Sequence, residues 1–468
     1  MSLAANTNTS PMAGQHKLKR EKLLMCGYNT LSQHDVKCLV QYCSQSDSGI
    51  VERVLLASLF TGRSFEDLAR NDVEIRYIAG TDFGALFSSL SFPKWNKNCS
   101  EDKAASSGNL RPFVILPRDI IESLEAASGQ STDVLIEEAI ELLKTLNRAT
   151  QSRLTLIRIK QYLKMQAAKC SLTQAEVHWI SNTPLKEHGG NSYLSMSGAE
   201  LAQKHYPFIN ALMKIAQLPQ FEIESVLNNR IMLPAMGSNF RVPELKIKIA
   251  IEKLKKTIKK LQRFDTQDHW KLFNCYTYYT VVVLNMCTGH RPSRKYYGKL
   301  ENFDLSRRVV LVNDKENRES ARVLPLNESA FIQFTFYLSF LEAFVTKIQY
   351  IYPTEADILR RTLKGETPLF HLRINTGLKS FSHSAAMSSD IPTIKARGNW
   401  NRHWIRSAIA LWVDIKPSAI DAFMGHENLL DESFSSYSSL DMSDMRHIAD
   451  ALNDELELMS VARLEVTL

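Results

Sequence analysis

The feature that most constrains the fold is a short interruption of an otherwise helical pattern. Apolar residues recur at helical spacing along most of the 468 residues, for example in Val51–Phe60 and Ser131–Leu146. Two β-branched runs, Arg308–Val312 and Ala321–Leu324, break this spacing, and the polar turn Asn313–Ser320 separates them. Strand, turn and strand is the order expected there. The sequence therefore predicts a mainly α-helical, multidomain chain with a small antiparallel β-hairpin.

Composition excludes several classes of protein. Hydrophobic residues make up 44% and charged residues 23%, which is typical of a soluble globular chain. The seven cysteines form no Cys-x-x-Cys pair, so neither a zinc ribbon nor a disulfide framework is indicated. The longest apolar stretch, Tyr278–Cys287, is about half the length that a bilayer requires. We expect a protein that uses no metal or other cofactor and binds no membrane, in a reducing compartment such as bacterial cytoplasm.

A basic segment lies in the middle of the chain. The net charge is +7, and Leu245–Arg263 holds eight basic residues against one acid, Glu252. Such a density of like charge favours a phosphate backbone as partner, although a solvated helix face is the alternative. The basic residues are Lys246, Lys248, Lys253, Lys255, Lys256, Lys259, Lys260 and Arg263.

The C-terminal part of the chain carries residues suited to phosphate chemistry. In chain order they are Arg291, Lys315, His403, Arg406, His426 and Tyr437. His403 and Arg406 are three residues apart, so they share one side of a helix. Each residue alone is a common structural feature. Their order is the distinctive signal.

This order resembles the tyrosine recombinase (phage integrase) family. The resemblance covers roughly Gln267 to Leu440, and Tyr437 stands where the family has its nucleophile. The family's motifs are matched in turn by Thr288–Pro292 for the first arginine, Asn302–Leu326 for the lysine-bearing strands, Asn401–Ala410 for the second arginine, and Ala419–His426 for the helix that ends in Gly-His. Arg294 replaces an acid that the family usually has, and we expect it to touch DNA.

The resemblance implies a site-specific DNA strand-transferase that needs neither metal nor ATP. Its nucleophile forms a 3′-phosphotyrosine, and its partners are double-stranded DNA and other protomers. A dimer would bind each site and a homo-tetramer would join two sites, with accessory DNA-bending or directionality proteins as further partners. Integration or excision of a mobile element is the process that this activity serves.

The chemistry of the residues is consistent with this activity. Cleavage of a phosphodiester builds negative charge on the non-bridging oxygens, and the forked guanidiniums of Arg291 and Arg406 can clamp them. His403 and His426 can donate hydrogen bonds or carry the tyrosine proton. Lys315, on the hairpin, is expected to protonate the leaving 5′ oxygen.

Polar stretches punctuated by glycine and proline suggest the domain boundaries. The final helix has apolar residues on one side and could pack on its own domain or on a neighbouring protomer. The expected units are a disordered tail (1–15), an N-terminal helical domain (16–110), a helical DNA-binding domain (111–240), a basic linker or helix (241–263), the catalytic domain (264–440) and the C-terminal helix (441–468).

Other readings remain open. A type IB topoisomerase or a telomere resolvase would share the same active-site chemistry, and a catalytically silent DNA-binding or architectural protein would share only the partner.

The N-terminal half raises a separate question, because Leu55–Val73 contains Thr61-Gly62-Arg63 and resembles the first arginine motif. This half is either a decayed duplicate of the catalytic domain or a set of short helices that look alike by chance.

Overall fold

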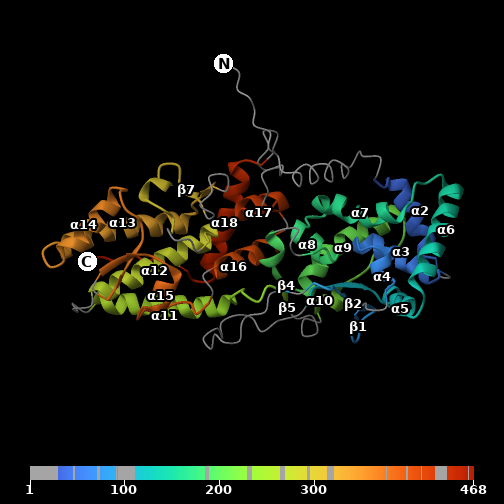
Figure 1. Ribbon diagram of the computed structural model, residues 1–468, viewed down its shortest axis with the longest axis horizontal. Coiled ribbons are helices and arrows are strands. Elements are labelled where there is room, and N and C mark those ends of the chain that lie inside the picture. Colours follow the sequence, from blue (N-terminus) through green and yellow to red (C-terminus); the bar gives the residue numbers. More distant parts are fainter. Residues whose placement is uncertain are drawn as a thin grey trace, which may run out of the picture.

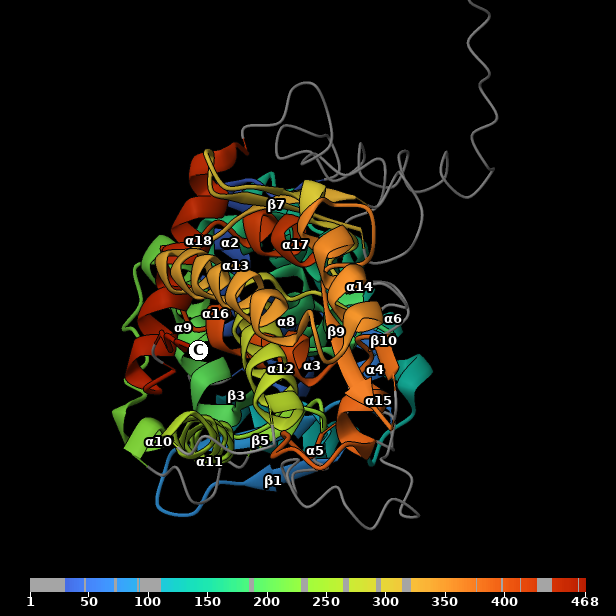
Figure 2. The same ribbon diagram turned by 90° about the vertical axis from the view of Figure 1, so that its left-hand side faces the viewer.

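Two hydrophobic cores divide the chain near residue 240. One core joins buried residues from Leu31 to Met236 together with Ala410, and the other joins buried residues from Val242 to Val466. The computed structural model shows the two halves side by side along the long axis, and Figure 2 views the C-terminal half end-on (Figures 1 and 2). The structure describes residues 30–45, 48–70, 74–90, 92, 111–184, 189–228, 235–263, 269–291, 296–313, 321–375, 377–396, 399–412, 414–426, 440–461 and 463–468.

The N-terminal half packs helices around a three-stranded antiparallel sheet. The sheet has the order β1-β2-β3, with Ala85 opposite Ile115, and α5 covers it. The elements are α2 (Gln33–Cys43), α3 (Ile50–Thr61), α4 (Phe65–Leu68), β1 (Ile75–Tyr77), β2 (Phe83–Phe87), β3 (Phe113–Pro117), α5 (Arg118–Ala127), α6 (Thr132–Thr150), α7 (Leu156–Gln166), η1 (Ala167–Cys170), α8 (Gln174–Ile180), η3 (Gly189–Ser192), β4 (Ser195–Ser197), α9 (Gly198–Ile215), α10 (Glu224–Asn228) and β5 (Ala235–Gly237).

The C-terminal half has the same mainly helical character. Its described elements are α11 (Glu244–Arg263), α12 (His269–Thr288), η5 (Leu300–Asn302), β6 (Phe303–Asp304), β7 (Val309–Val312), β8 (Arg322–Pro325), α13 (Glu328–Ile348), α14 (Pro353–Leu363), β9 (His371–Ile374), β10 (Gly377–Ser380), α15 (His383–Ser388), α16 (Trp400–Ile409), α17 (Pro417–Met424) and α18 (Met442–Leu458). The mainly α-helical class with small antiparallel sheets is thus confirmed.

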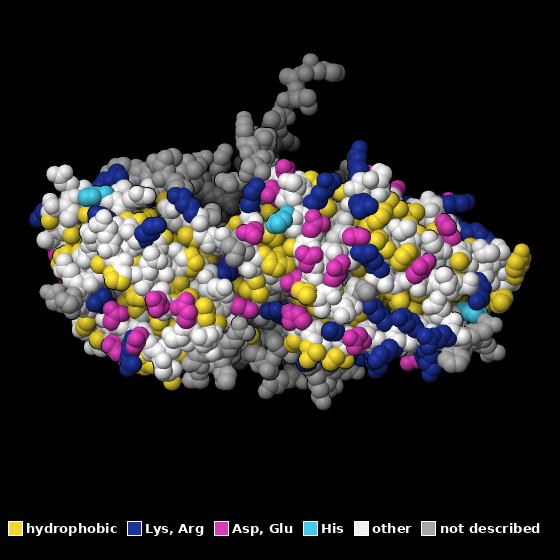
Figure 3. Space-filling model, turned by 180° about the vertical axis from the view of Figure 1, so that it is seen from behind, with side chains coloured by type: hydrophobic (Ala, Val, Ile, Leu, Met, Phe, Trp, Pro, Cys, Tyr) yellow, Lys and Arg dark blue, Asp and Glu magenta, His cyan; other side chains and the backbone are white. Residues whose placement is uncertain are grey.

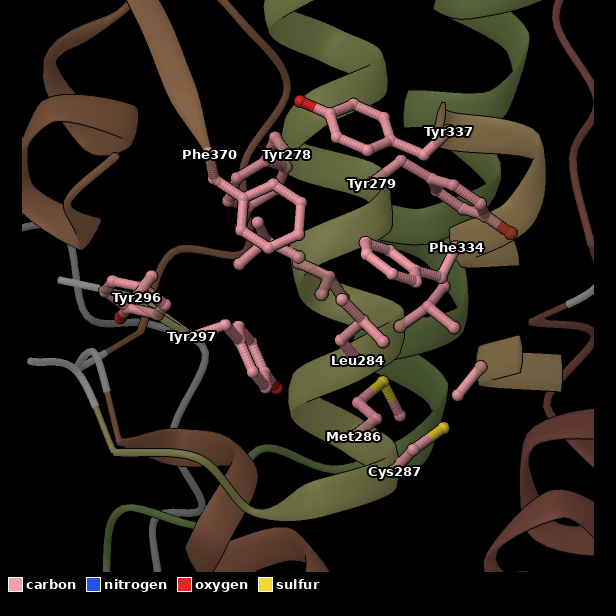
Figure 4. Close-up of a cluster of buried hydrophobic side chains, with 14 of the residues drawn as sticks. Tyr278, Tyr279, Leu284, Met286, Cys287, Tyr296, Tyr297, Phe334, Tyr337 and Phe370 are labelled. Atoms are coloured by element: carbon pink, nitrogen blue, oxygen red, sulfur yellow. The ribbon is translucent and has the colours of Figure 1, made fainter. Parts of the chain in front are cut away.

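Helix α12 is the centre of this half. Every residue from Leu272 to Thr288 is buried, because α11, α13, α16 and α18 surround the helix. Its polar side chains find partners inside the core: Thr277 bonds the Tyr337 hydroxyl, and Asn285 accepts from the Tyr297 hydroxyl. Figure 4 shows these tyrosines packed with Phe334 and Phe370 along the helix (Figure 4). Burial on all sides explains why the sequence reads as a continuous apolar run.

The expected hairpin is present. Strands β7 and β8 pair antiparallel, with Val310 opposite Leu324, and β6 extends the pair to a three-stranded sheet. Its turn, which carries Lys315, lies outside the described residues.

The structure can be compared with the expected domain boundaries. The division between residues 110 and 111 falls inside one core, because β2 and β3 pair across it. The basic helix α11 and the final helix α18 both belong to the C-terminal core, and α18 packs on α12, α13, α16 and α17 of its own chain. The expected disordered tail lies outside the described residues.

The two halves repeat one order of elements. In each, a helix ends at a Thr-Gly pair whose glycine is left-handed, with φ of +67° at Gly62 and +61° at Gly289. A three-stranded antiparallel sheet in chain order then follows. Later a short helix (α8 or α17) precedes a longer one (α9 or α18), and the two helices are separated by the same length of chain in both halves. A decayed duplicate of the catalytic domain predicts such a shared order.

Helix α13 is long and apolar enough to cross a bilayer, judged by length and composition alone. Half of its most apolar window is buried within the fold, and the core helices of globular proteins pass the same test. The helix therefore carries only weak evidence for a membrane.

Two buried histidines should make stability depend on pH. Burial lowers the pKa of His205 and of His371 to about 4, whereas an unfolded chain keeps the ordinary value of 6.5. The unfolded state therefore binds more protons as the pH falls from about 6.5 towards 4, and stability is lost across that window. We expect each histidine to cost about 1–2 kcal/mol between pH 7 and pH 5. Urea unfolding at both pH values measures this, and His205→Gln should reduce the difference whereas His447→Gln, at an exposed position, should not.

Candidate active site

Three segment ends meet between the two halves. They are the turn after α12, the N-terminal part of α16 and the C-terminal end of α17, and in Figure 1 this junction lies beside α8 of the N-terminal half. Helix α12 ends at Thr288 and helix α17 at Met424, and the glycine that follows each, Gly289 or Gly425, is in the left-handed conformation that glycine adopts without steric cost. Both turns thereby direct the following residue, His290 or His426, inward, where both are buried.

Arg402 ties these ends together. Its side chain is fully buried and donates from Nη1 to the Gly289 carbonyl at 2.6 Å and from Nη2 to the Met424 carbonyl at 2.5 Å. Nη2 also lies 3.0 Å from Nε2 of His426. A guanidinium can only donate, so Nε2 must hold a lone pair, and the ring of His426 is neutral with its proton on Nδ1.

Asn401 adds a second connection to the α12 turn. Its amide nitrogen donates to the carbonyls of Asn285 and His290 at 3.1 and 3.0 Å. The backbone immediately before Arg291 is therefore fixed against α16. Arg291 itself is half-buried at the edge of this junction.

Arg406 lies one helical turn beyond Arg402, on the same side of α16. It is fully buried, and its Nη1 is 2.7 Å from Oδ1 of Asp421, although the two are not aligned as a hydrogen bond. Within the described part of the chain, Nε and Nη2 of Arg406 have no hydrogen-bond acceptor. A buried guanidinium with two unused donors is suited to receive an oxyanion.

His403 is held from both ring nitrogens. Nδ1 is 2.7 Å from the hydroxyl of Ser238, and Nε2 is 3.3 Å from the amide nitrogen of Asn399. Because the amide nitrogen of Asn399 faces the ring, Asn399 donates and Nε2 of His403 accepts. His403 is therefore also neutral, and its Nδ1 donates to Ser238. Ser238 follows β5 in the N-terminal half, so the two halves meet directly on a candidate catalytic residue.

Tyr193 covers the junction from the N-terminal half. Its ring centroid is 4.5 Å from that of His403 and 4.9 Å from that of His426, with the latter pair stacked. The guanidinium carbon of Arg402 lies 5.2 Å from the same ring. One aromatic ring thus contacts three of the polar residues of the site.

The structure brings together three of the six expected site residues and places a fourth beside them. His403, Arg406 and His426 lie at one junction, and Arg291 follows the turn that Asn401 and Arg402 hold. Lys315, Tyr437 and Arg294 lie outside the described residues.

Sequence reasoning missed the residues that hold this site. Arg402, Asp421, Ser238 and Tyr193 were not expected to take part. For Arg402 a signal existed, because it lies one helical turn before Arg406 and must share its face of α16. For Tyr193 and Ser238 there was none, because only the tertiary fold brings them to His403.

The lysines of α11 form a basic surface on the C-terminal half. Lys246, Lys253, Lys256, Lys259, Lys260 and Arg263 are exposed, and Lys248 and Lys255 are half-buried. Lys246 and Lys253, with Lys271 and Lys395, line a groove of about 610 Å³ between α11 and residues 390–395. Figure 3 shows dark blue side chains gathered over this region at the lower right (Figure 3). Only six of the eight expected lysines and arginines therefore face solvent fully.

Comparison with known proteins identifies no relative: no family model, no curated protein and no solved structure matches the chain. Among the described residues, no group of three or more histidine, cysteine or acidic side chains is placed to hold a metal ion.

Removing the partner of Arg406 should destabilise the fold strongly. Asp421→Ala leaves a buried guanidinium without a counter-charge, and we expect a loss of about 3–5 kcal/mol in the free energy of unfolding. Asp390→Ala breaks the exposed pair with Lys271 and is the matched control, for which no measurable change is expected. Urea unfolding compares the two. Equal effects would show that Asp421 does not balance the charge of Arg406.

Proposed function

We propose that this chain is a tyrosine recombinase, which cleaves and rejoins DNA strands through a covalent 3′-phosphotyrosine. The observation that carries the proposal is the convergence of His403, Arg406 and His426 beside the turn that precedes Arg291. These groups come from three separate segments, and a chance match of short motifs gives no reason for them to meet. The arrangement places the buried guanidinium of Arg406 and two neutral imidazoles at one junction, with Arg291 at its edge.

Each group has a role in the proposed reaction. The phenol oxygen of Tyr437 attacks the phosphorus and forms a P–O bond, while the bond to the 5′ oxygen breaks. Arg406, steadied by Asp421, donates Nε and Nη2 to the non-bridging oxygens together with Arg291. The imidazole of His403 or His426 accepts the phenol proton once its unprotonated Nε2 is released from Asn399 or Arg402, and Lys315 gives a proton to the leaving 5′ oxygen.

Further features follow from the resemblance to the family and belong to the same proposal. Duplex DNA is the substrate, a dimer binds each site, and two sites are joined in a tetramer. Phosphate contacts by the α11 lysines hold the duplex in register, while base contacts elsewhere select the sequence.

The nucleophile is tested with a suicide substrate that traps the covalent intermediate. Tyr437→Phe should form no denaturant-stable adduct with DNA from the region flanking the gene, because it lacks the attacking oxygen. Tyr350→Phe, at a position 89% exposed, is the control and should form adduct as the wild type does. Gel electrophoresis under denaturing conditions gives the answer. An adduct in Tyr437→Phe would remove that residue from the mechanism.

The α11 surface is tested by the salt dependence of DNA affinity. Changing Lys253, Lys256 and Lys260 to Gln should reduce the slope of log affinity against log salt by roughly 0.9 for each lost phosphate contact. The control changes Lys144, Arg148 and Lys160 to Gln, which removes the same charge from exposed positions in the N-terminal half. Fluorescence anisotropy with a labelled duplex measures both. A slope in the α11 variant equal to that of the wild type would exclude α11 from the interface.

One observation favours a second candidate, a catalytically silent DNA-binding protein. Both nitrogens of His403 are already engaged, and Tyr193 covers His403 and His426. A protein of that kind would bind duplex DNA and never form the adduct, so the suicide substrate separates the two candidates.

A further inference from the structure

Tyr193 and Tyr437 hold the same position in the two repeats. Helix α8 ends at Ile180, and helix α17 ends at Met424. The separation in sequence from Ile180 to Tyr193 equals that from Met424 to Tyr437. In both repeats a long helix then begins at an equal distance beyond the tyrosine, at Gly198 and at Met442. The tyrosine of the N-terminal repeat is therefore the counterpart of the proposed nucleophile, and it points into the site of the other repeat.

The ring of Tyr193 fills the space over the polar residues. Its centroid distances of 4.5 and 4.9 Å to the rings of His403 and His426 are those of aromatic rings in direct contact. The chain just before it is equally close, because a Cβ added to Gly189 would lie 3.5 Å from the His426 ring. A phosphate cannot stand between rings that already touch. In this conformation the face that each imidazole turns towards Tyr193 is closed to DNA.

Polar contacts also hold the two halves together where the N-terminal half meets α16. We call this contact the seam. The backbone nitrogen of Ser195 donates to the hydroxyl of Ser407 at 3.0 Å, and Nζ of Lys204 donates to the Ala410 carbonyl. Ser238 meets His403 at 2.7 Å. Each of these contacts joins an N-terminal residue to α16 or its end, so the halves cannot part without breaking them.

We propose that Tyr193 is a built-in plug of the candidate site, and that the halves must separate at this seam before a DNA phosphate can enter. This inference rests on the proposed function and adds a regulation to it. A ligand that binds only the open state has its apparent affinity reduced by the fraction of molecules that are open. Weakening the plug should therefore speed the reaction.

Ring removal gives the first test. Tyr193→Ala should form the suicide-substrate adduct about tenfold or more faster than wild type, whereas Tyr193→Phe keeps the ring and should stay at the wild-type rate. Hydrogen–deuterium exchange of the amides of residues 189–197 is followed in the same proteins, without DNA. Exchange should be faster in Tyr193→Ala than in Tyr193→Phe.

A reversible lock gives the second test, which does not depend on how Tyr193→Ala folds. Cysteines at Ser195 and Ser407 should join the halves when oxidised, because the two residues already touch. Adduct formation should then be lost and should return on reduction, whereas Ser407→Cys alone should be indifferent to oxidation.

The outcomes separate the plug from the proposed function. Adduct formation by the locked protein, or a Tyr193→Ala rate no higher than that of Tyr193→Phe, overturns the plug and leaves the recombinase proposal standing. No adduct in the wild type, in Tyr193→Ala or in the reduced cysteine pair overturns the recombinase proposal. In that case the exchange rates decide the plug: faster exchange in Tyr193→Ala supports it, and equal rates overturn it.

Discussion

The site depends on the hydrogen bonds that the fully buried guanidinium of Arg402 donates. A charge removed from water must be satisfied inside the protein, and Arg402 meets this need by donating to the carbonyls of Gly289 and Met424. Those carbonyls belong to the two turns that carry His290 and His426. The requirement to satisfy one cation therefore sets the distance between two segments that lie far apart in the sequence. Arg406 and His403 follow on the same helix, so their positions are determined by the same anchor.

The N-terminal repeat also has a buried arginine that donates to a carbonyl at a helix end, but this arginine lies at another place in the repeat. Arg63, which directly follows Thr61-Gly62, is buried and donates to the carbonyls of Ile180 and Phe87. Ile180 ends α8, as Met424 ends α17. In the C-terminal repeat Arg402 binds the corresponding carbonyl, and Arg322 donates to that of Phe423. Burial lowers the pKa of Arg63 to about 10, still far above neutral pH, so it remains a charged structural tie. The arginine after the turn thus holds the fold together in the N-terminal repeat, while the one in the C-terminal repeat, Arg291, stays at the edge of the site.

The sequence predicted those elements that a short stretch of residues is enough to specify. The β7–β8 hairpin, the helix that bears His403 and Arg406, and the glycine that ends α17 were all read from short stretches of sequence. The sheet β1-β2-β3 was missed, because β2 and β3 are buried throughout and lack the alternation that marks a half-exposed strand. The same error placed a domain boundary between two paired strands. Of the site, sequence order supplied candidates for the chemistry but not Tyr193 or Asp421. Their roles arise from proximity in the fold, and Tyr193 belongs to the opposite half of the chain from His403.

Under the proposed function, the closed seam and the basic surface would act on the same encounter with DNA. Most lysines of α11 are exposed while the seam is closed, so a duplex would meet them before it reaches the site. Arg241, just before α11, donates to the Ser195 carbonyl and to Glu244, which links the start of that helix to the seam. Phosphate contacts along α11 would therefore be made beside the contacts that must break. A ligand shifts a conformational equilibrium only by its difference in affinity for the two states. Under the proposed plug, DNA supplies that difference through phosphate contacts at the site, which exist only when the halves are apart. The α11 contacts are common to both states, so they would help to bind the DNA but would not favour opening.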